Sequence, residues 1–169
     1  TSTGAGSPPA FETAAAGGIS DLSPYFHAYD SNGQVFASES TWTKLTFTTE
    51  SLDSDSAYDT ANYKFTVPTG KAGKYYFSTG TSIESSAAYN VVSSHMKIYK
   101  NGTAPSGSEL MGTKTYTGNT AGPDRISISM SVILDLAVGD YIESFGAGSS
   151  SDGGGIHTGA QYFSGFKIG

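Results

Sequence analysis

The chain has 169 residues, a formal net charge of −6 at pH 7, and no cysteine. Charged residues make up only 14% of it, and its few lysines and arginines are too scattered for the phosphate contacts of a nucleic-acid-binding protein. The lack of cysteine excludes disulfide bonds and zinc sites built from thiolates. No apolar run is long enough to span a bilayer, so insertion into a membrane is not expected.

Residues 1–24 differ in composition from the rest of the chain. Small residues, Pro8-Pro9 and Gly17-Gly18 leave this segment little apolar surface to bury. It is expected to form an extended arm or connector that becomes ordered where a neighbour packs against it, and a flexible tail is the alternative. The chain starts with Thr1 and shows no signal-peptide pattern, which favours a segment of a longer protein.

Alternation with a period of two is clearest between Arg125 and Leu136. Apolar side chains occupy every second position on one face there: Ile126, Ile128, Met130, Val132, Leu134 and Leu136. Three serines and Asp135 occupy the other face. Because successive side chains on a strand point to opposite faces, this segment is predicted to be a long strand with one buried face.

Shorter segments with strand character follow one another through residues 25–169. Strands are predicted at 25–29, 34–37, 42–48, 63–67, 74–79, 94–99, 141–145 and 162–168. Asn32-Gly33 predicts a hairpin turn between the first two, and Asn101-Gly102 predicts the turn that closes strand 94–99. Many short strands without helical periodicity predict an all-β sandwich or barrel.

Four segments carry motifs that occur in the same order in one known family. They are YDTANYKFTVPTGKAGKYYFS (58–78), MKIYKNG (96–102), VILDLAVGDYIE (132–143) and YFSGFKIG (162–169). Their Phe-Thr-x-Pro, Gly-x-Tyr-Tyr-Phe-Ser, Lys-Asn-Gly, Leu-x-x-Gly-Asp and Phe-Ser-Gly-Phe motifs resemble those of C1q-like domains. The chain departs from the family at Lys71-Ala72, which lengthen a loop, and in the long Ser/Gly-rich stretch 146–159.

The resemblance implies a ten-stranded C1q/TNF-like jelly roll that assembles as a homotrimer. Aromatic residues on both faces of neighbouring strands fit this assembly, because one face fills the core and the other needs a partner. The candidate interface residues are Tyr76, Tyr141, Phe145, Phe163 and Phe166. An ordinary sandwich that exposes a few tyrosines is the alternative.

The N-terminal segment TSTGAGSPPAFE (1–12) carries a second resemblance. It is similar to the connector that precedes C-terminal head domains in phage tail fibres and related virion proteins. This implies a location on the virion surface or outside the cell, with the arm contacting other virion proteins.

No motif predicts catalysis, so the chain is not expected to be an enzyme. It has no GxSxG elbow, no phosphate-binding loop, and no HExxH among its three histidines. Asp53, Asp55 and Asp59 alternate as calcium ligands do, but Tyr58 and Lys64 stand where an EF-hand needs Gly and Glu. A solvated acidic loop is therefore expected and no cofactor is predicted, with a less regular calcium site as the alternative.

Three stretches rich in Ser, Gly, Asn, Thr and Tyr, at 85–93, 103–124 and 147–159, are predicted to be binding loops. The candidate receptor contacts are Tyr89, Tyr116, Asp124, Asp152 and His157. The sequence thus predicts a trimeric head domain of a viral fibre or surface spike that attaches to a cell-surface glycan or protein. The alternatives are a structural capsid-decoration or fibre-trimerisation module without receptor binding, and a secreted or surface adhesin of cellular origin.

Overall fold

The computed structural model describes residues 22–85, 91–113, 125–151 and 155–168, and this part of the chain forms strands and no helix. The strands are β1 (Tyr25–Asp30), β2 (Thr43–Lys44), β3 (Thr49–Asp53), β4 (Tyr58–Asp59), β5 (Lys64–Thr66), β6 (Gly73–Ser85), β7 (Val91–Lys100), β8 (Glu109–Thr113), β9 (Arg125–Leu136), β10 (Tyr141–Ser150) and β11 (Ile156–Lys167). The prediction of an all-β chain is confirmed.

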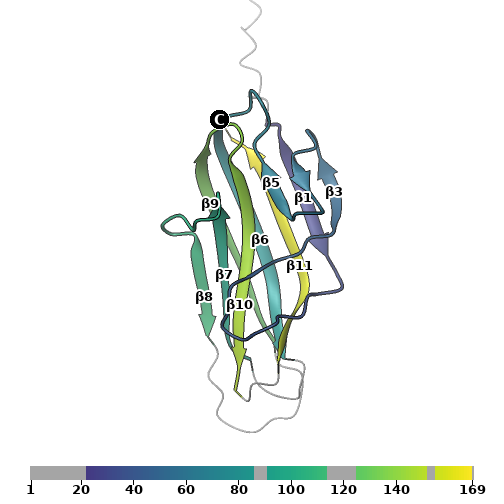
Figure 1. The fold of residues 1–169 in the computed structure, drawn as a ribbon, viewed down its shortest axis with the longest axis vertical. Coiled ribbons are helices and arrows are strands. Elements are labelled where there is room, and N and C mark those ends of the chain that lie inside the picture. The colour runs from purple at the N-terminus through teal and green to yellow at the C-terminus, as the bar shows by residue number, and fades with distance from the viewer. Residues whose placement is uncertain (1–21, 86–90, 114–124, 152–154, 169) are drawn as a thin grey trace, which may run out of the picture.

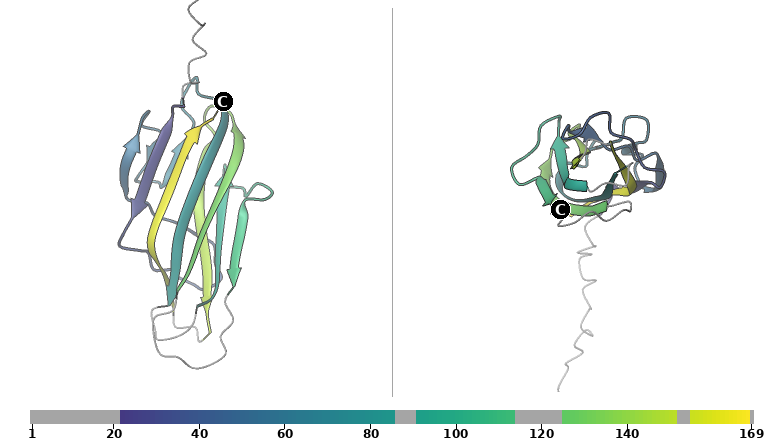
Figure 2. Two further views of the ribbon diagram at one scale, coloured as in Figure 1. Left: turned by 180° about the vertical axis from the view of Figure 1, so that it is seen from behind. Right: turned by 90° about the horizontal axis from the view of Figure 1, so that it is seen from below.

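The strands form two antiparallel sheets that pack face to face around one core (Figures 1 and 2). The five-stranded sheet has the order β3-β1-β11-β6-β9. The six-stranded sheet has the order β4-β5-β10-β7-β8, and the two-residue β2 pairs with β10 beside that path. Without β2 the two paths contain the ten strands that the resemblance implies.

The strand predicted from alternation has the bounds of β9, Arg125–Leu136. Its Ile128 and Leu136 are buried, and its other inward apolar residues pack against the core. The serines at alternate positions lie on the outer face and are exposed. Alternation predicted this strand well because one of its faces is buried and the other is not.

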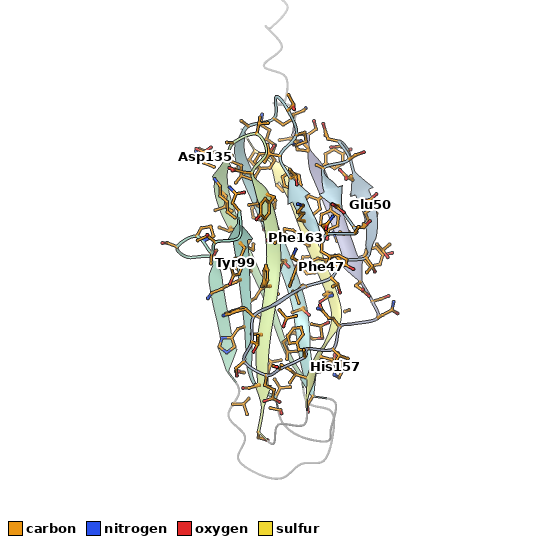
Figure 3. The ribbon with its side chains drawn as sticks, in the orientation of Figure 1. Phe47, Glu50, Tyr99, Asp135, His157 and Phe163 are labelled. Atoms are coloured by element: carbon orange, nitrogen blue, oxygen red, sulfur yellow. The ribbon has the colours of Figure 1, made fainter. Side chains whose placement is uncertain are left out.

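Aromatic rings fill the space between the sheets. Ring centroids 5.0–6.3 Å apart connect Phe26, Phe65, Phe77 and Phe163, and Figure 3 shows Phe163 beside Phe47 between the sheets. Gly165 lies against this cluster, since a Cβ added to it would stand 2.5 Å from Cδ1 of Phe77. The glycine of the Phe-Ser-Gly-Phe motif is therefore required for close packing of β11.

The segment 33–47 does not form the hairpin predicted at Asn32-Gly33. Gly33 has φ +74°, and a Cβ there would stand 2.0 Å from the carbonyl oxygen of Thr158, so the chain turns toward β11. Predicted strand 34–37 is only an isolated bridge between Val35 and His157, and predicted strand 42–48 pairs only over β2. The segment instead closes one edge of the sandwich with inward side chains, which are Phe36, Leu45 and Phe47.

Other strands differ from the predictions in their ends. The sequence did not predict β3, β4 or β8. The predicted strands at β6 and β10 end before the observed ones, and the predicted strands at β7 and β11 begin after the observed ones. Tyr63, the first residue of predicted strand 63–67, has φ +52° and lies half-buried before β5 begins at Lys64. The turn at Asn101-Gly102 is confirmed, with φ +52° and +75°.

We call the two ends of the sandwich the proximal pole, which is the upper end in Figure 1, and the distal pole, which is the lower end. At the proximal pole, Lys167 N–H donates to the carbonyl oxygen of Pro24 at 3.1 Å, so β1 starts where β11 ends. At the distal pole, β6 ends where β9 and β11 begin, since Glu84 pairs with Arg125 and Ser85 with Ile156. The stretches 86–90, 114–124 and 152–154 all connect strand ends at the distal pole, and they lie outside the described residues.

Candidate functional site

The outer face of the five-stranded sheet carries a row of apolar side chains across four strands. Tyr25 of β1 lies opposite Phe166 of β11. Tyr76 of β6 lies opposite Phe166 on one side and Ile133 of β9 on the other. Tyr25, Phe166 and Ile133 expose 44%, 37% and 60% of their surfaces. We call these four residues the apolar row; a contiguous exposed patch of this kind is typical of a protein interface.

Aromatic and polar side chains continue this face toward the distal pole. The His27 ring stacks near the rings of Tyr29 and Tyr162, with centroids 6.1 and 6.3 Å away. Its Nδ1 lies 2.6 Å from the hydroxyl of Ser164 on the neighbouring strand. Leu52 of β3, opposite His27, is 55% exposed. The face thus combines apolar surface with groups that can form hydrogen bonds, as interfaces between proteins do.

A depression of about 430 Å³ lies on the same face nearer the distal pole. Gly80 forms part of its floor, and the ring of Tyr162 covers this glycine so closely that a Cβ would stand 2.5 Å from it. Serines of β9 and Arg125 line the other side. Glu84 lies next to it and contacts Arg125 Nε at 3.5 Å and His157 Nε2 at 3.6 Å.

The outer face of the six-stranded sheet carries a second hollow. It has a volume of about 290 Å³ and is lined by Ser40, Trp42, His95 and Ala147. The rings of Trp42 and His95 meet nearly at right angles, with centroids 6.0 Å apart. The ammonium group of Lys97 lies 4.3 Å from the Trp42 ring centroid. Trp42 is therefore held in place by contacts with two residues of β7.

Beside this hollow, aromatic rings and an ion pair cover β10. Phe145 packs on Tyr99 with ring centroids 4.3 Å apart. Lys44 of β2 contacts the carboxylate of Glu143, whose side chain is only 9% exposed. The ammonium group of Lys44 thereby neutralises a largely buried charge.

The turn between β9 and β10 is organised by one carboxylate. Asp140 accepts hydrogen bonds from Lys100 Nζ, Asn101 Nδ2 at 2.7 Å and Ala137 N–H at 2.8 Å. The hydrogen bonds from Lys100, Asn101 and Ala137 lower the pKa of Asp140 to about 2. This explains the Gly-Asp of the motif: Gly139 supplies φ +83° and Asp140 joins the turn to the end of β7.

The acidic loop uses its carboxylates to hold its own backbone. Asp53 accepts from the N–H groups of Asp55, Ala57 and Tyr58. Asp59 accepts from the side chain and backbone of Asn62, and these hydrogen bonds lower its pKa. Within the described ranges, no three His, Cys, Asp or Glu side chains come together as a metal site.

Two tyrosines with buried side chains, Tyr58 and Tyr75, lie next to the acidic loop. Burial raises the pKa of Tyr75 to about 12, with the charge of Asp55 adding to it, and its hydroxyl donates to the Lys71 carbonyl. Burial also raises the pKa of Tyr58, with smaller effects from nearby acidic groups. Both hydroxyls therefore remain protonated and structural.

The five predicted interface residues fall in three places. Tyr76 and Phe166 lie together in the apolar row, as one interface requires. Tyr141 and Phe145 lie on the outer face of the other sheet, pointing away from that row. The prediction for Phe163 is wrong, because its ring has no exposed surface and belongs to the core.

Of the predicted receptor contacts, Tyr89, Tyr116, Asp124 and Asp152 lie outside the described residues. The structure places His157 at the start of β11, on the outer face, where it is 32% exposed and faces Glu84 (Figure 3). A contact role for these five residues stays a prediction.

Sequence reasoning did not identify Tyr25, Leu52 or Ile133 as surface residues of interest, nor Trp42. A signal existed for Ile133, since it is the one apolar residue among the serines on the outer face of β9. Trp42 carried no such signal, because its neighbours on β7 and β10 are distant in sequence.

Comparison with known proteins gives a match in structure alone. No family model matches the chain, and no curated protein sequence matches it. Among solved structures, the globular domain of zebrafish complement 1qA protein superposes with a TM-score of 0.54 at 16% identity, covering 86% of this chain and 97% of that one. None of the segments that the structure describes forms a helix that is long and apolar enough to cross a membrane. The fold of this chain is therefore that of a C1q-like globular domain, as the resemblance of the four ordered segments implied.

Proposed function

We propose that this protein is a non-catalytic, homotrimeric head domain of a viral fibre or surface spike that attaches to a cell-surface glycan or protein. The apolar row carries the self-association part of this proposal. Three of its four residues expose more than a third of their surfaces to water on the outer face of the sheet. A second and a third copy of the chain would bury this row.

The attachment part is supported by how the chain is arranged between the poles. Pro24, directly before β1, lies next to the end of β11 at the proximal pole, so the arm 1–24 joins the domain there. All three stretches that connect strands β6–β7, β8–β9 and β10–β11 join the domain at the distal pole. A fibre entering at one pole leaves the other free for a partner, and three copies multiply weak contacts into avidity.

Two measurements test the proposal. Light scattering coupled to size exclusion is expected to give three times the mass of the chain at micromolar concentration, and a monomer would overturn the assembly. Fluorescently labelled protein is expected to bind host cells or a glycan array. A stable trimer that binds neither would favour the structural decoration or fibre-trimerisation module instead.

A further inference from the structure

We infer that the hollow formed by Ser40, Trp42, His95 and Ala147 on the six-stranded sheet binds a pyranose ring of a cell-surface glycan. This inference rests on the proposed attachment function and names the place and ligand class for it. The hollow has a volume of about 290 Å³, at the lower end of the roughly 300–1,000 Å³ of small-molecule pockets. That size fits one sugar ring better than an extended peptide.

The wall of the hollow matches the apolar face of a sugar. A pyranose presents C–H groups on its faces, and the electron-rich face of an indole attracts such weakly positive groups. Trp42 is half-buried and already contacts Lys97 and His95 of β7, so binding would not need to order this side chain. Ala147 lies opposite His95 in the β10–β7 register and is only 3% exposed, so it forms the floor of the hollow.

The rim of the hollow matches the hydroxyl groups of a sugar. Two register positions closer to the distal pole, at the next pair on the same face, the hydroxyls of Ser93 and Ser149 lie 2.8 Å apart. Ser40 is fixed by its N–H, which donates to the carbonyl oxygen of Gly148 at 2.7 Å. Hydroxyl groups both donate and accept, so this rim can satisfy the varied hydroxyls of a saccharide.

The location is compatible with the proposed assembly. The hollow lies on the outer face of the six-stranded sheet, whereas the apolar row lies on the outer face of the five-stranded sheet. Burial of the apolar row between copies would leave each hollow turned outward. A trimer would therefore present three equivalent subsites.

Trp42 also provides the measurement, because it is the only tryptophan in the chain. Intrinsic fluorescence of the trimer would be recorded during titration with methyl pyranosides, and the same protein would be applied to a glycan array. We expect a saturable change in Trp42 emission with at least one pyranoside. We also expect Trp42→Ala and Ala147→Leu to reduce array binding about tenfold, the effect of removing or blocking one anchor.

The control is Tyr141→Ala, which removes a half-buried aromatic ring from the outer face of the same sheet at the proximal end, away from the residues that line the hollow. It should bind as the unmodified protein does, and circular dichroism of all three variants checks that they fold. Array binding that survives both hollow variants, with no change in Trp42 emission, would overturn this site while leaving the attachment function intact. A trimer that binds no glycan would overturn the site and leave only a protein receptor for the proposed function.

Discussion

The hydroxyl oxygens of Thr79 and Ser144 lie 3.0 Å apart and join the two sheets in the middle of the core. Neither residue has exposed surface. Thr79 also donates to the carbonyl oxygen of Tyr162 at 2.9 Å, which uses its single proton. Ser144 is therefore the donor in the bond between the sheets.

This assignment predicts unequal effects of two substitutions. Ser144→Ala should lower the free energy of unfolding by about 1 kcal/mol, because Thr79 keeps its own donor bond. Thr79→Val should cost about 2–3 kcal/mol, because it leaves the Ser144 hydroxyl buried without an acceptor and removes the bond to Tyr162. Urea unfolding measures both, and equal losses would mean that the donor is Thr79.

Self-association should depend on Ile133. Ile133→Asp places a charge in the apolar row of the proposed interface, where burial without a partner costs several kcal/mol. The variant is expected to run as a monomer in light scattering while its circular dichroism remains unchanged. Val138→Asp, at another exposed apolar residue outside the row, is the matched control and should remain a trimer. Monomers from both variants would point to a general effect of added charge.

The ion pair of Lys44 and Glu143 should stabilise the fold mainly by avoiding an unpaired charge. Lys44→Met leaves a carboxylate that is 9% exposed without its cation. The free energy of unfolding is expected to fall by about 2 kcal/mol. This is less than the loss for a fully buried ion pair, because Lys44 itself is one-third exposed. Combining Lys44→Met with Glu143→Leu should restore most of the lost stability in thermal unfolding. A double variant as unstable as the single one would contradict this explanation.

The Asp140 turn predicts a pH-dependent contribution to stability. The pKa of this carboxyl is lowered to about 2 in the folded chain, from an ordinary value of 3.8. Its stabilisation is therefore complete above the ordinary value and is lost as the pH falls toward 2. Asp140→Asn should cost about 1 kcal/mol at pH 6 and progressively less as the pH falls below 4.

Urea midpoints of the two proteins across this pH range provide the measurement. Asp135→Asn is the control, since its side chain is 73% exposed and its pair with Lys74 lies at the surface, where it contributes little. A difference between Asp140→Asn and the unmodified protein that is the same at pH 2 and pH 6 would refute the role of the ionised carboxylate.

The parts of the fold that the sequence predicted are those where local pattern and burial agree. β9 alternates at every position except Ile133, and its bounds were predicted to the residue. The segment 33–47 also alternates, but its partner is determined by Gly33 packing against Thr158, more than a hundred residues away. No local pattern records that contact, so a hairpin was predicted instead.

The candidate sites were harder to predict, because the residues of different strands that share one surface are determined only once the sheets have formed. Tyr76 and Phe166, which lie in motifs of two adjacent strands, do pair on one outer face, and their role in an interface stays a prediction. Phe163 was assigned to the same interface as Phe166. Side chains three positions apart on a strand point to opposite faces, so only one of the two can point outward. Trp42 and His95 meet only because the edge-closing segment crosses to the six-stranded sheet, which requires the whole sandwich.

The pairing of β1 with β11 has a consequence for how the protein reaches its native state. The first and last strands of the sandwich are neighbours in one sheet, and β11 also separates β1 from β6. A nascent chain that lacks β11 therefore cannot complete the five-stranded sheet, however much of it has left the ribosome. Folding dominated by such distant pairings is slow, on the order of milliseconds to seconds. The apolar face of β6 therefore remains exposed, and the chain remains prone to aggregation, until β11 has been synthesised and has paired with it.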